Sequence, residues 1–272
     1  MTDGMRAFVE DASGSGFALP QAWRSAPTPN PDLAHALRLA QRVIPSLRGE
    51  QGGVSPANAL RLGDDVALQA LCDHWAQAYP EAGAHYLALR CWGLAIWQPI
   101  YLCVIAVHLD GLAPRLAGLV QPVKAGFPSG FHLPVHAPVG GTFVGRMEAA
   151  AAELRAFCDA VRRAIKPMVA LHERAADRLQ AECVLGALMA VRPHTSLSDA
   201  DMTAIGEAWL VALGIAGGCG FFAYRARDGT PALALDRKVC CHYFRRRDGE
   251  KCSTCPKLSL DARIARLLAE AS

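Results

Sequence analysis

Apolar residues recur every three to four positions over long stretches of this chain, which is the spacing of one face of an α-helix. The period is lost where glycine and proline gather, so each stretch has a start and an end. Helices are predicted over residues 32–47, 65–79, 82–98, 146–190 and 198–213, with one further start behind Ser55-Pro56. Pro167 marks a boundary or a kink inside the fourth range. Helix therefore dominates the predicted structure.

Residues 92–109 form an uncharged apolar run that meets the lower length limit for a membrane span. Gln98 and Pro99 interrupt it near its middle, and Asp110 follows it directly. A helix buried in the protein core is therefore the preferred interpretation, with Pro99 either ending or kinking it.

Short strands and turns are predicted in two places. Between about residues 120 and 145, Gly, Pro, Phe and His alternate without a helical period. A hairpin is predicted over 221–235, because Asp228-Gly229 is a strong turn signal between two apolar runs. A closing helix then follows Ser259.

These elements predict a mainly α fold, with a helical bundle-like body and a small β element. Residues 1–30, rich in Gly, Ser and Pro, form a loose lead-in, and residues 31–236 form the body. The hairpin leads into a carboxy-terminal segment, residues 237–272, that carries cysteines and the closing helix. With 52% hydrophobic and 19% charged residues among 272, the composition is that of a globular protein.

Charge and cysteine content narrow the class of protein. The net charge of +3 is too small to indicate nucleic-acid binding. Residues 237–257, however, carry seven Lys or Arg against two Asp or Glu, so the positive charge is concentrated there and the rest of the chain is net negative. Ten cysteines without a predicted signal peptide indicate a reducing, cytoplasmic location. Six of them are expected in the core: Cys72, Cys91, Cys103, Cys158, Cys183 and Cys219.

The other four cysteines form a compact motif. Cys240-Cys241 is followed after ten residues by Cys252 and Cys255. Thiolate is a soft ligand that suits zinc or iron–sulfur clusters, but structural zinc sites space each ligand pair by two to four residues. Neighbouring side chains in a strand leave opposite faces, so two adjacent ligands require a turn or kink at this point.

This motif, with the basic residues Arg237 and Lys238 just ahead of it, resembles the carboxy-terminal segment of the FhuF-type ferric-siderophore reductases. The resemblance implies a [2Fe–2S] cluster held by Cys240, Cys241, Cys252 and Cys255. It also implies one-electron reduction of ferric siderophores in the cytosol, with no catalytic residue beyond the cluster.

The same resemblance bears on partners. No dinucleotide-binding or P-loop glycine pattern occurs, so electrons are expected from a separate donor such as a ferredoxin or a reductase. We expect no nucleic acid partner and at most peripheral contact with a membrane.

Basic residues around the motif are candidates for docking either an acidic donor or an anionic ferric chelate. They are Arg237, Lys238, Arg245, Arg246 and Arg247. His242 either bonds a cluster sulfur, tuning the potential, or faces solvent. A cleft beside the cluster is expected to be lined partly by aromatic residues: Trp92, Trp97, Tyr101, Phe127 and Phe131.

Two other interpretations remain open from the sequence. The cysteines suit a structural zinc site that staples the carboxy terminus. They also suit an iron–sulfur sensor or binding module, in which the redox state alters affinity for a partner. The colour and metal content of the purified protein separate zinc from iron.

Overall fold

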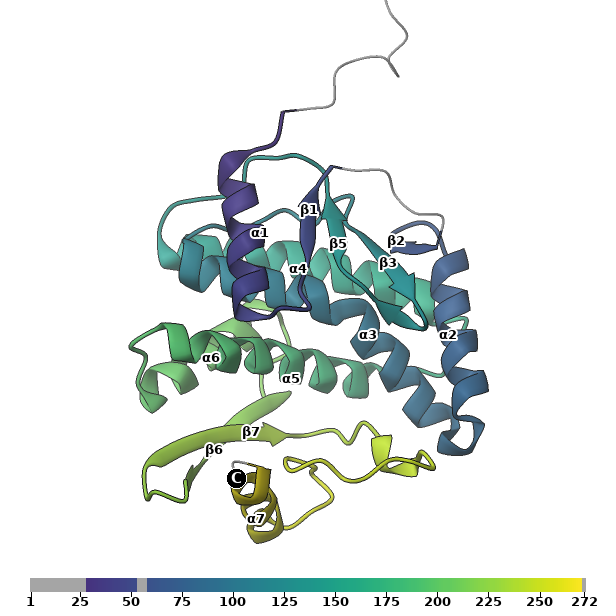
Figure 1. The fold of residues 1–272 in the computed structure, drawn as a ribbon, viewed down its shortest axis with the longest axis vertical. Helices are drawn as coiled ribbons and strands as arrows, with labels where there is room; N and C mark the ends of the chain where they lie inside the picture. Colours follow the sequence, from purple (N-terminus) through teal and green to yellow (C-terminus); the bar gives the residue numbers. More distant parts are fainter. Residues whose placement is uncertain (1–27, 53–57, 271–272) are drawn as a thin grey trace, which may run out of the picture.

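The computed structural model describes residues 28–52 and 58–270, and helices predominate among them, which confirms the mainly α class (Figure 1). Most of the predicted lead-in and the helix start at Ser55-Pro56 lie outside these residues. The helices are α1 (Pro31–Val43), α2 (Val66–Ala78), α3 (Gly83–Ile105), α4 (Phe143–Ile165), α5 (Glu173–Val191), α6 (Asp199–Ala212) and α7 (Leu260–Glu270). Short helical turns occupy Pro80–Ala82, Ala106–Asp110, Arg192–His194 and Tyr243–Arg245.

Two small sheets accompany the helices. The strands are β1 (Gly49–Gln51), β2 (Ala59–Arg61), β3 (Val120–Lys124), β4 (Phe127–Pro128), β5 (Phe131–Leu133), β6 (Cys219–Arg225) and β7 (Pro231–Arg237). The first sheet has the order β1-β5-β3-β2, with β4 also paired to β3 and only β1–β5 parallel. The second is the β6–β7 hairpin, which turns at Gly229 and confirms the predicted Asp-Gly turn.

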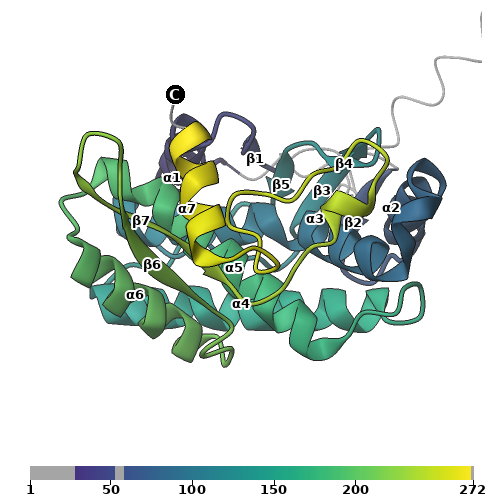
Figure 2. The ribbon, with the colours of Figure 1, turned by 90° about the horizontal axis from the view of Figure 1, so that it is seen from below.

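The elements stack in layers. The first sheet, α1 and α2 lie on one side of α3 and α4, while α5 and α6 lie on the other (Figure 1). Seen from below, the hairpin, the cysteine segment and α7 cover α5 on the side away from the sheet (Figure 2). The helix α3 contacts α1, α2, α4 and α5, so it is the centre of the core.

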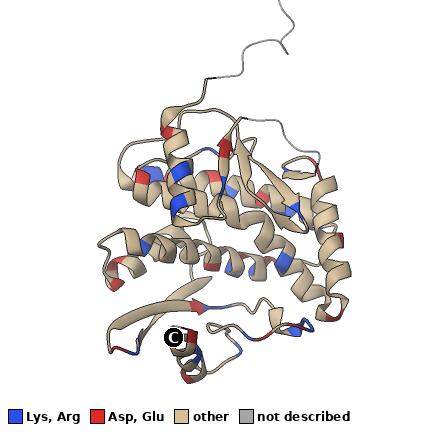
Figure 3. Ribbon diagram, in the orientation of Figure 1, with Lys and Arg blue, Asp and Glu red and all other residues tan. Residues whose placement is uncertain are grey.

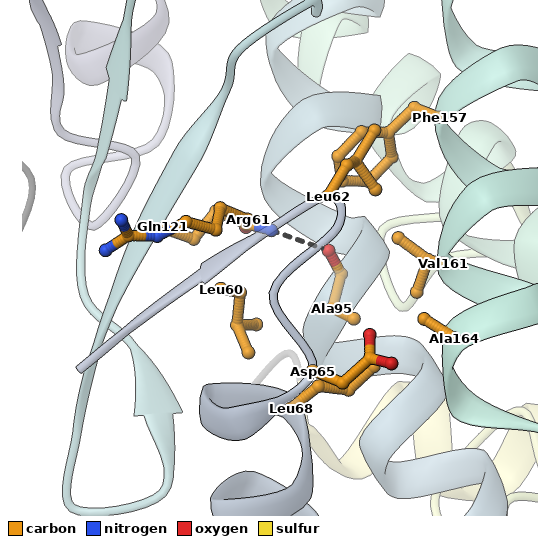
Figure 4. Close-up of a pocket in the computed structure, with 10 residues that line it drawn as sticks. All are labelled: Leu60, Arg61, Leu62, Asp65, Leu68, Ala95, Gln121, Phe157, Val161 and Ala164. Atoms are coloured by element: carbon orange, nitrogen blue, oxygen red, sulfur yellow. Dashed lines mark hydrogen bonds between the residues drawn. The ribbon is translucent and has the colours of Figure 1, made fainter. Parts of the chain in front are cut away.

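Contrary to one of the two outcomes predicted for it, Pro99 does not end a helix: α3 runs through it to Ile105. Proline lacks the N–H that would bond the carbonyl four residues earlier, which leaves the Ala95 oxygen without its helical partner. The side-chain amide of Gln121, on β3, donates to that oxygen at 2.8 Å (Figure 4). A buried side chain distant in sequence thus replaces the missing backbone bond and lets the helix continue.

The stretch Pro80–Asp110 is long and apolar enough to cross a membrane by composition. In the structure, 72% of its most apolar window is buried inside the protein. It packs as the core helix that the interrupted pattern favours.

Local signals end and begin helices as the sequence predicts. The Ser198 hydroxyl accepts from the Asp201 N–H at 3.1 Å, and the Asp201 carboxylate accepts from the Ser198 N–H at 2.9 Å, forming a capping box for α6. The Ser259 hydroxyl caps α7 by accepting from the Ala262 N–H at 3.3 Å.

His108, in the π-helical turn after α3, links three helices. The Trp209 indole N–H of α6 donates to His108 Nε2 at 3.0 Å, and Phe143 of α4 packs against the ring at 5.1 Å. Burial, aided by the Arg146 cation, lowers the pKa of His108 to about 4. The folded protein therefore holds this imidazole neutral.

This arrangement predicts acid sensitivity. Because the unfolded chain takes up a proton near pH 6.5 and the folded chain only near pH 4, stability falls as the pH drops through this window. We expect the free energy of unfolding to fall by about 2 kcal/mol between about pH 7 and about pH 5 through this residue alone. Urea unfolding of His108→Gln should show a correspondingly smaller loss. His194→Gln, at an exposed histidine, should keep the wild-type pH dependence; equal slopes for all three proteins would contradict the assignment.

Candidate metal centre

The strand β7 ends at Arg237, and the segment that carries Cys240 and Cys241 follows it, on the far side of α5 from the first sheet (Figure 1). His242 follows with φ 58° and ψ 16°, a left-handed backbone that a non-glycine residue seldom adopts. This reversal confirms the kink that two adjacent ligands require. It also points the His242 N–H at the Cys240 sulfur, at 3.4 Å.

Cys252 and Cys255 lie on a second tight turn. The Cys255 N–H donates to the Cys252 carbonyl at 3.1 Å, and the Leu258 N–H donates to the Cys255 carbonyl at 3.0 Å. The sulfurs of Cys240 and Cys255 are 3.7 Å apart. Two thiolates on one tetrahedral metal, with bonds of about 2.3 Å, lie about 3.8 Å apart, so this pair already has the spacing of ligands to one ion.

All four cysteines line one small cavity. Its other lining residues are Arg237, Tyr243, Phe244, Glu250, Lys251 and Pro256. Among the described residues, no three His, Cys, Asp or Glu side chains converge as ligands of one metal ion. A [2Fe–2S] cluster takes two thiolates on each of its irons, so a donor set of four cysteines fits such a cluster.

Cys255 is buried, Cys240 and Cys241 are partly buried, and Cys252 is exposed. Burial raises the pKa of Cys240 to about 11, although the bond from the His242 N–H opposes the shift. Burial also raises the pKa of Cys252, against the attraction of Arg237. Since only thiolates ligate metal, loading of the site must release protons.

Arg237 is a buried cation within this centre. Its side chain is 9% exposed, its Nε donates to the Glu182 carboxylate of α5 at 2.6 Å, and one NH group donates to the Cys252 sulfur at 2.8 Å. Burial opposes its charge, yet Glu182 and the thiols raise the pKa of Arg237. Burial also opposes the charge of Glu182 and raises its pKa, despite the ionic partner. Arg237 thus links the core helix α5 to Cys252.

The loop between the two cysteine pairs packs against the helical body and is hydrogen-bonded to it. Arg246 stacks on the Tyr79 ring at 3.8 Å and binds the Asp248 carboxylate at 2.6 Å. The Arg247 backbone N–H donates to Glu81 at 3.0 Å, and its guanidinium donates to the Ala78 carbonyl at 2.8 Å. These contacts hold the loop against the end of α2 and the turn that follows.

The helix α7 secures the other side. Arg263 binds the Asp236 carboxylate at 3.0 Å and lies over the Phe222 ring at 4.9 Å, while Arg266 donates to the Lys251 carbonyl. The closing helix therefore ties the hairpin to the stretch that carries Cys252 (Figure 2).

The cations predicted to dock partners differ in what they contact. On the ribbon, blue Lys and Arg positions follow β7 and occur again in the loop beyond it (Figure 3). Arg237, Arg246 and Arg247 have the partners given above, and Lys238 pairs with Asp236. Among the described residues, exposed Arg245 makes no ion pair, so it is the one of the five that presents an uncompensated charge to solvent. Pairing of this kind is a tertiary property that the basic composition does not reveal.

His242 contacts the sulfur of Cys240 through its backbone, not its ring. The ring lies between His85, at 5.6 Å, and Phe244, at 6.1 Å. Its Nδ1 is buried and has no hydrogen-bond partner among the described residues.

The pocket beside the cysteines is lined mostly by residues other than the aromatic ones expected from the sequence. Trp92 and Phe131 are core residues, and the Trp92 indole donates to the Ala176 carbonyl at 3.0 Å. Trp97 alone of the five lines a pocket of about 370 Å³ that adjoins the cysteines. Tyr86 and Arg90 line it too and were missed. Their signal was present in the sequence, because residues 86, 90, 93 and 97 share one face of a helix.

A buried cation lies beside four thiols, which two tight turns bring to one cavity; this is the arrangement of a cysteine-ligated metal centre. In comparison with protein families, residues 237–257 match the model of the FhuF 2Fe-2S C-terminal domain. The match spans all four cysteines and the loop between them, and the rest of the chain lies outside it. The cysteine segment is thus similar to a FhuF-type [2Fe–2S] domain, which supports a [2Fe–2S] cluster as its cofactor.

Proposed function

We propose that this protein reduces ferric siderophores by one electron, in the cytoplasm, with Cys240, Cys241, Cys252 and Cys255 holding the cluster. One observation carries the proposal. Cys241, Arg237 and Tyr243 line both the cysteine cavity and the larger pocket of about 370 Å³ beside it. A substrate in that pocket lies next to a cluster ligand with no intervening layer of protein.

When bound, a [2Fe–2S] cluster supplies a reversible one-electron couple. The chain contributes the surroundings. The Cys240 sulfur accepts the His242 N–H, and Arg237 places a positive charge at the Cys252 sulfur. Both interactions favour added negative charge, so they favour the reduced state.

The overall reaction balances without a proton-transferring residue. One electron passes from a separate donor of the ferredoxin or reductase class to the Fe(III) chelate, which becomes an Fe(II) chelate. Hard oxygen donors bind Fe(II) far more weakly than Fe(III), so the iron is then released to softer ligands. We infer that the donor approaches Cys252, the most exposed of the four cysteines. Arg245 and Lys257 are exposed and lie close enough to His242 to help burial lower its pKa, so they offer positive charge to an acidic donor.

Anaerobic optical titration of the purified protein tests the proposal. We expect a brown protein that dithionite bleaches and that a ferric siderophore re-oxidises, with one Fe(II) trapped by ferrozine for each electron stored. A protein that is bleached but not re-oxidised by any ferric chelate would be a sensor or binding module instead. A colourless protein containing zinc would contradict the proposal altogether.

A further inference from the structure

The pocket beside Cys241 has a mixed lining from three parts of the chain. The helix α3 supplies one wall, α5 the second and the cysteine segment the third. Its lining residues are Tyr86, Leu89, Arg90, Gly93, Leu94, Trp97, Leu179, Glu182, Arg237, Cys241 and Tyr243. Its volume of about 370 Å³ falls within the range of small-molecule sites, about 300–1,000 Å³.

One polar atom in this lining has no hydrogen-bond partner within the described residues. It is the Arg90 Nε, which is buried. Buried donors are normally satisfied, so this atom is an open position for a ligand oxygen. Tyr86 lies four residues earlier on the same face of α3; burial raises the pKa of its hydroxyl, and the Arg246 guanidinium lies close enough to oppose that shift.

Arg90 differs from Arg237, the other cation in this lining, in lacking a carboxylate partner. Its guanidinium lies over the rings of Trp75, at 4.2 Å, and Phe127, at 5.2 Å, and it forms no ion pair among the described residues. Arg237 in the same pocket is already neutralised by Glu182. Burial lowers the pKa of Arg90, as expected for a cation whose charge is poorly compensated.

We propose that this pocket receives one arm of an anionic ferric chelate, and that Arg90 binds its anionic oxygens. The proposal rests on the proposed reductase function. Hydroxamate arms just neutralise Fe(III), whereas catecholate or carboxylate arms leave a net negative charge. Because the cluster is itself anionic, an anionic chelate needs an uncommitted cation beside the cluster, and in this lining Arg90 is that cation.

Binding of redox-inert analogues to the cluster-loaded protein tests the site apart from turnover. Gallium(III) matches Fe(III) in charge but does not accept the electron, so calorimetric titration measures docking alone. The probes are the gallium(III) complexes of a tricatecholate and of a neutral trihydroxamate chelator. Arg90→Gln should weaken binding of the tricatecholate by about tenfold or more, as loss of a charge-assisted bond does, and leave the trihydroxamate within about twofold. Arg90→Lys should restore part of the loss.

Two further variants keep the test decisive. Arg163→Gln removes an exposed arginine of α4 outside the pocket and should bind both probes as the wild type does. Gly93→Leu adds a side chain on the pocket wall and should weaken both probes, since a Cβ there meets only Leu179, at 3.4 Å. Unchanged tricatecholate binding in Arg90→Gln, or unchanged binding of both probes in Gly93→Leu, would overturn the proposal.

The outcomes separate this inference from the proposed function. If the gallium complexes bind as expected but ferric chelates are not reduced, the pocket stands and the reductase activity falls. If the wild type reduces ferric chelates and Arg90→Gln reduces the anionic chelate with an unchanged KM, the reductase function is supported and the proposed role of Arg90 is contradicted.

Discussion

Cys252→Ser is expected to abolish the iron–sulfur cluster and the reductase activity while leaving the helical fold intact. A serine hydroxyl is a harder ligand than thiolate and stays protonated near neutral pH, so it does not replace the sulfur. Cys252 is exposed on a loop outside the helical core, so its loss costs the fold little. Iron and acid-labile sulfide should fall to background, together with visible absorption, while far-ultraviolet circular dichroism stays unchanged.

Cys219→Ala is the matched control. Cys219 is buried on β6, directly opposite Arg237 in the hairpin, yet it does not line the cavity of the four thiols. This variant should keep its full iron and sulfide content. An unaltered cluster in Cys252→Ser would refute the ligand assignment, as would equal cluster loss in both variants.

Arg237→Met is expected to have the second large effect, on stability and on the reduction potential together. It leaves the Glu182 carboxylate buried without its cation, which costs about 3–5 kcal/mol. It also removes a positive charge that contacts the Cys252 sulfur, so the potential should fall by on the order of 100 mV.

A double variant separates these two effects. Arg237→Met with Glu182→Leu removes both buried charges, so urea unfolding should show most of the lost stability restored. The reduction potential of the double variant, measured by spectroelectrochemistry, should lie between those of the two single variants, Arg237→Met and Glu182→Leu. Glu182→Leu by itself removes a negative charge and should raise the potential above that of the wild type. A potential that follows stability across the series would mean that Arg237 acts only through the fold.

Signals that act within a few residues predicted the structure well. Three short motifs each determine the local backbone conformation without help from distant residues. They are the cysteine spacing, the Ser198 cap of α6 and the Asp228-Gly229 turn. The three-residue strands β1 and β2 escaped prediction because they are too short to show a period. They exist through pairing with β5 and β3, which lie far along the chain.

The features that the sequence does not show share one cause, which is that distant residues complete the local arrangement. Pro99 breaks a helix in isolation, but the side chain of Gln121 from β3 replaces the missing hydrogen bond. The docking role of the basic loop stays a prediction, and the sequence does not show that Tyr79 and Glu81 of the helical body contact two of its arginines. Arg90 is recognised as a binding group only once the pocket around it is seen.

The left-handed backbone at His242 sets a boundary for engineering this protein. Side chains branched at Cβ are strongly disfavoured in that conformation, so valine, isoleucine and threonine should be poorly tolerated at this position. The pocket wall at Gly93, Trp97 and Leu179 lies on regular helix and has no such restriction. Efforts to change which molecule the pocket accepts should therefore diversify the helical wall and leave the turn after the cysteine pair untouched.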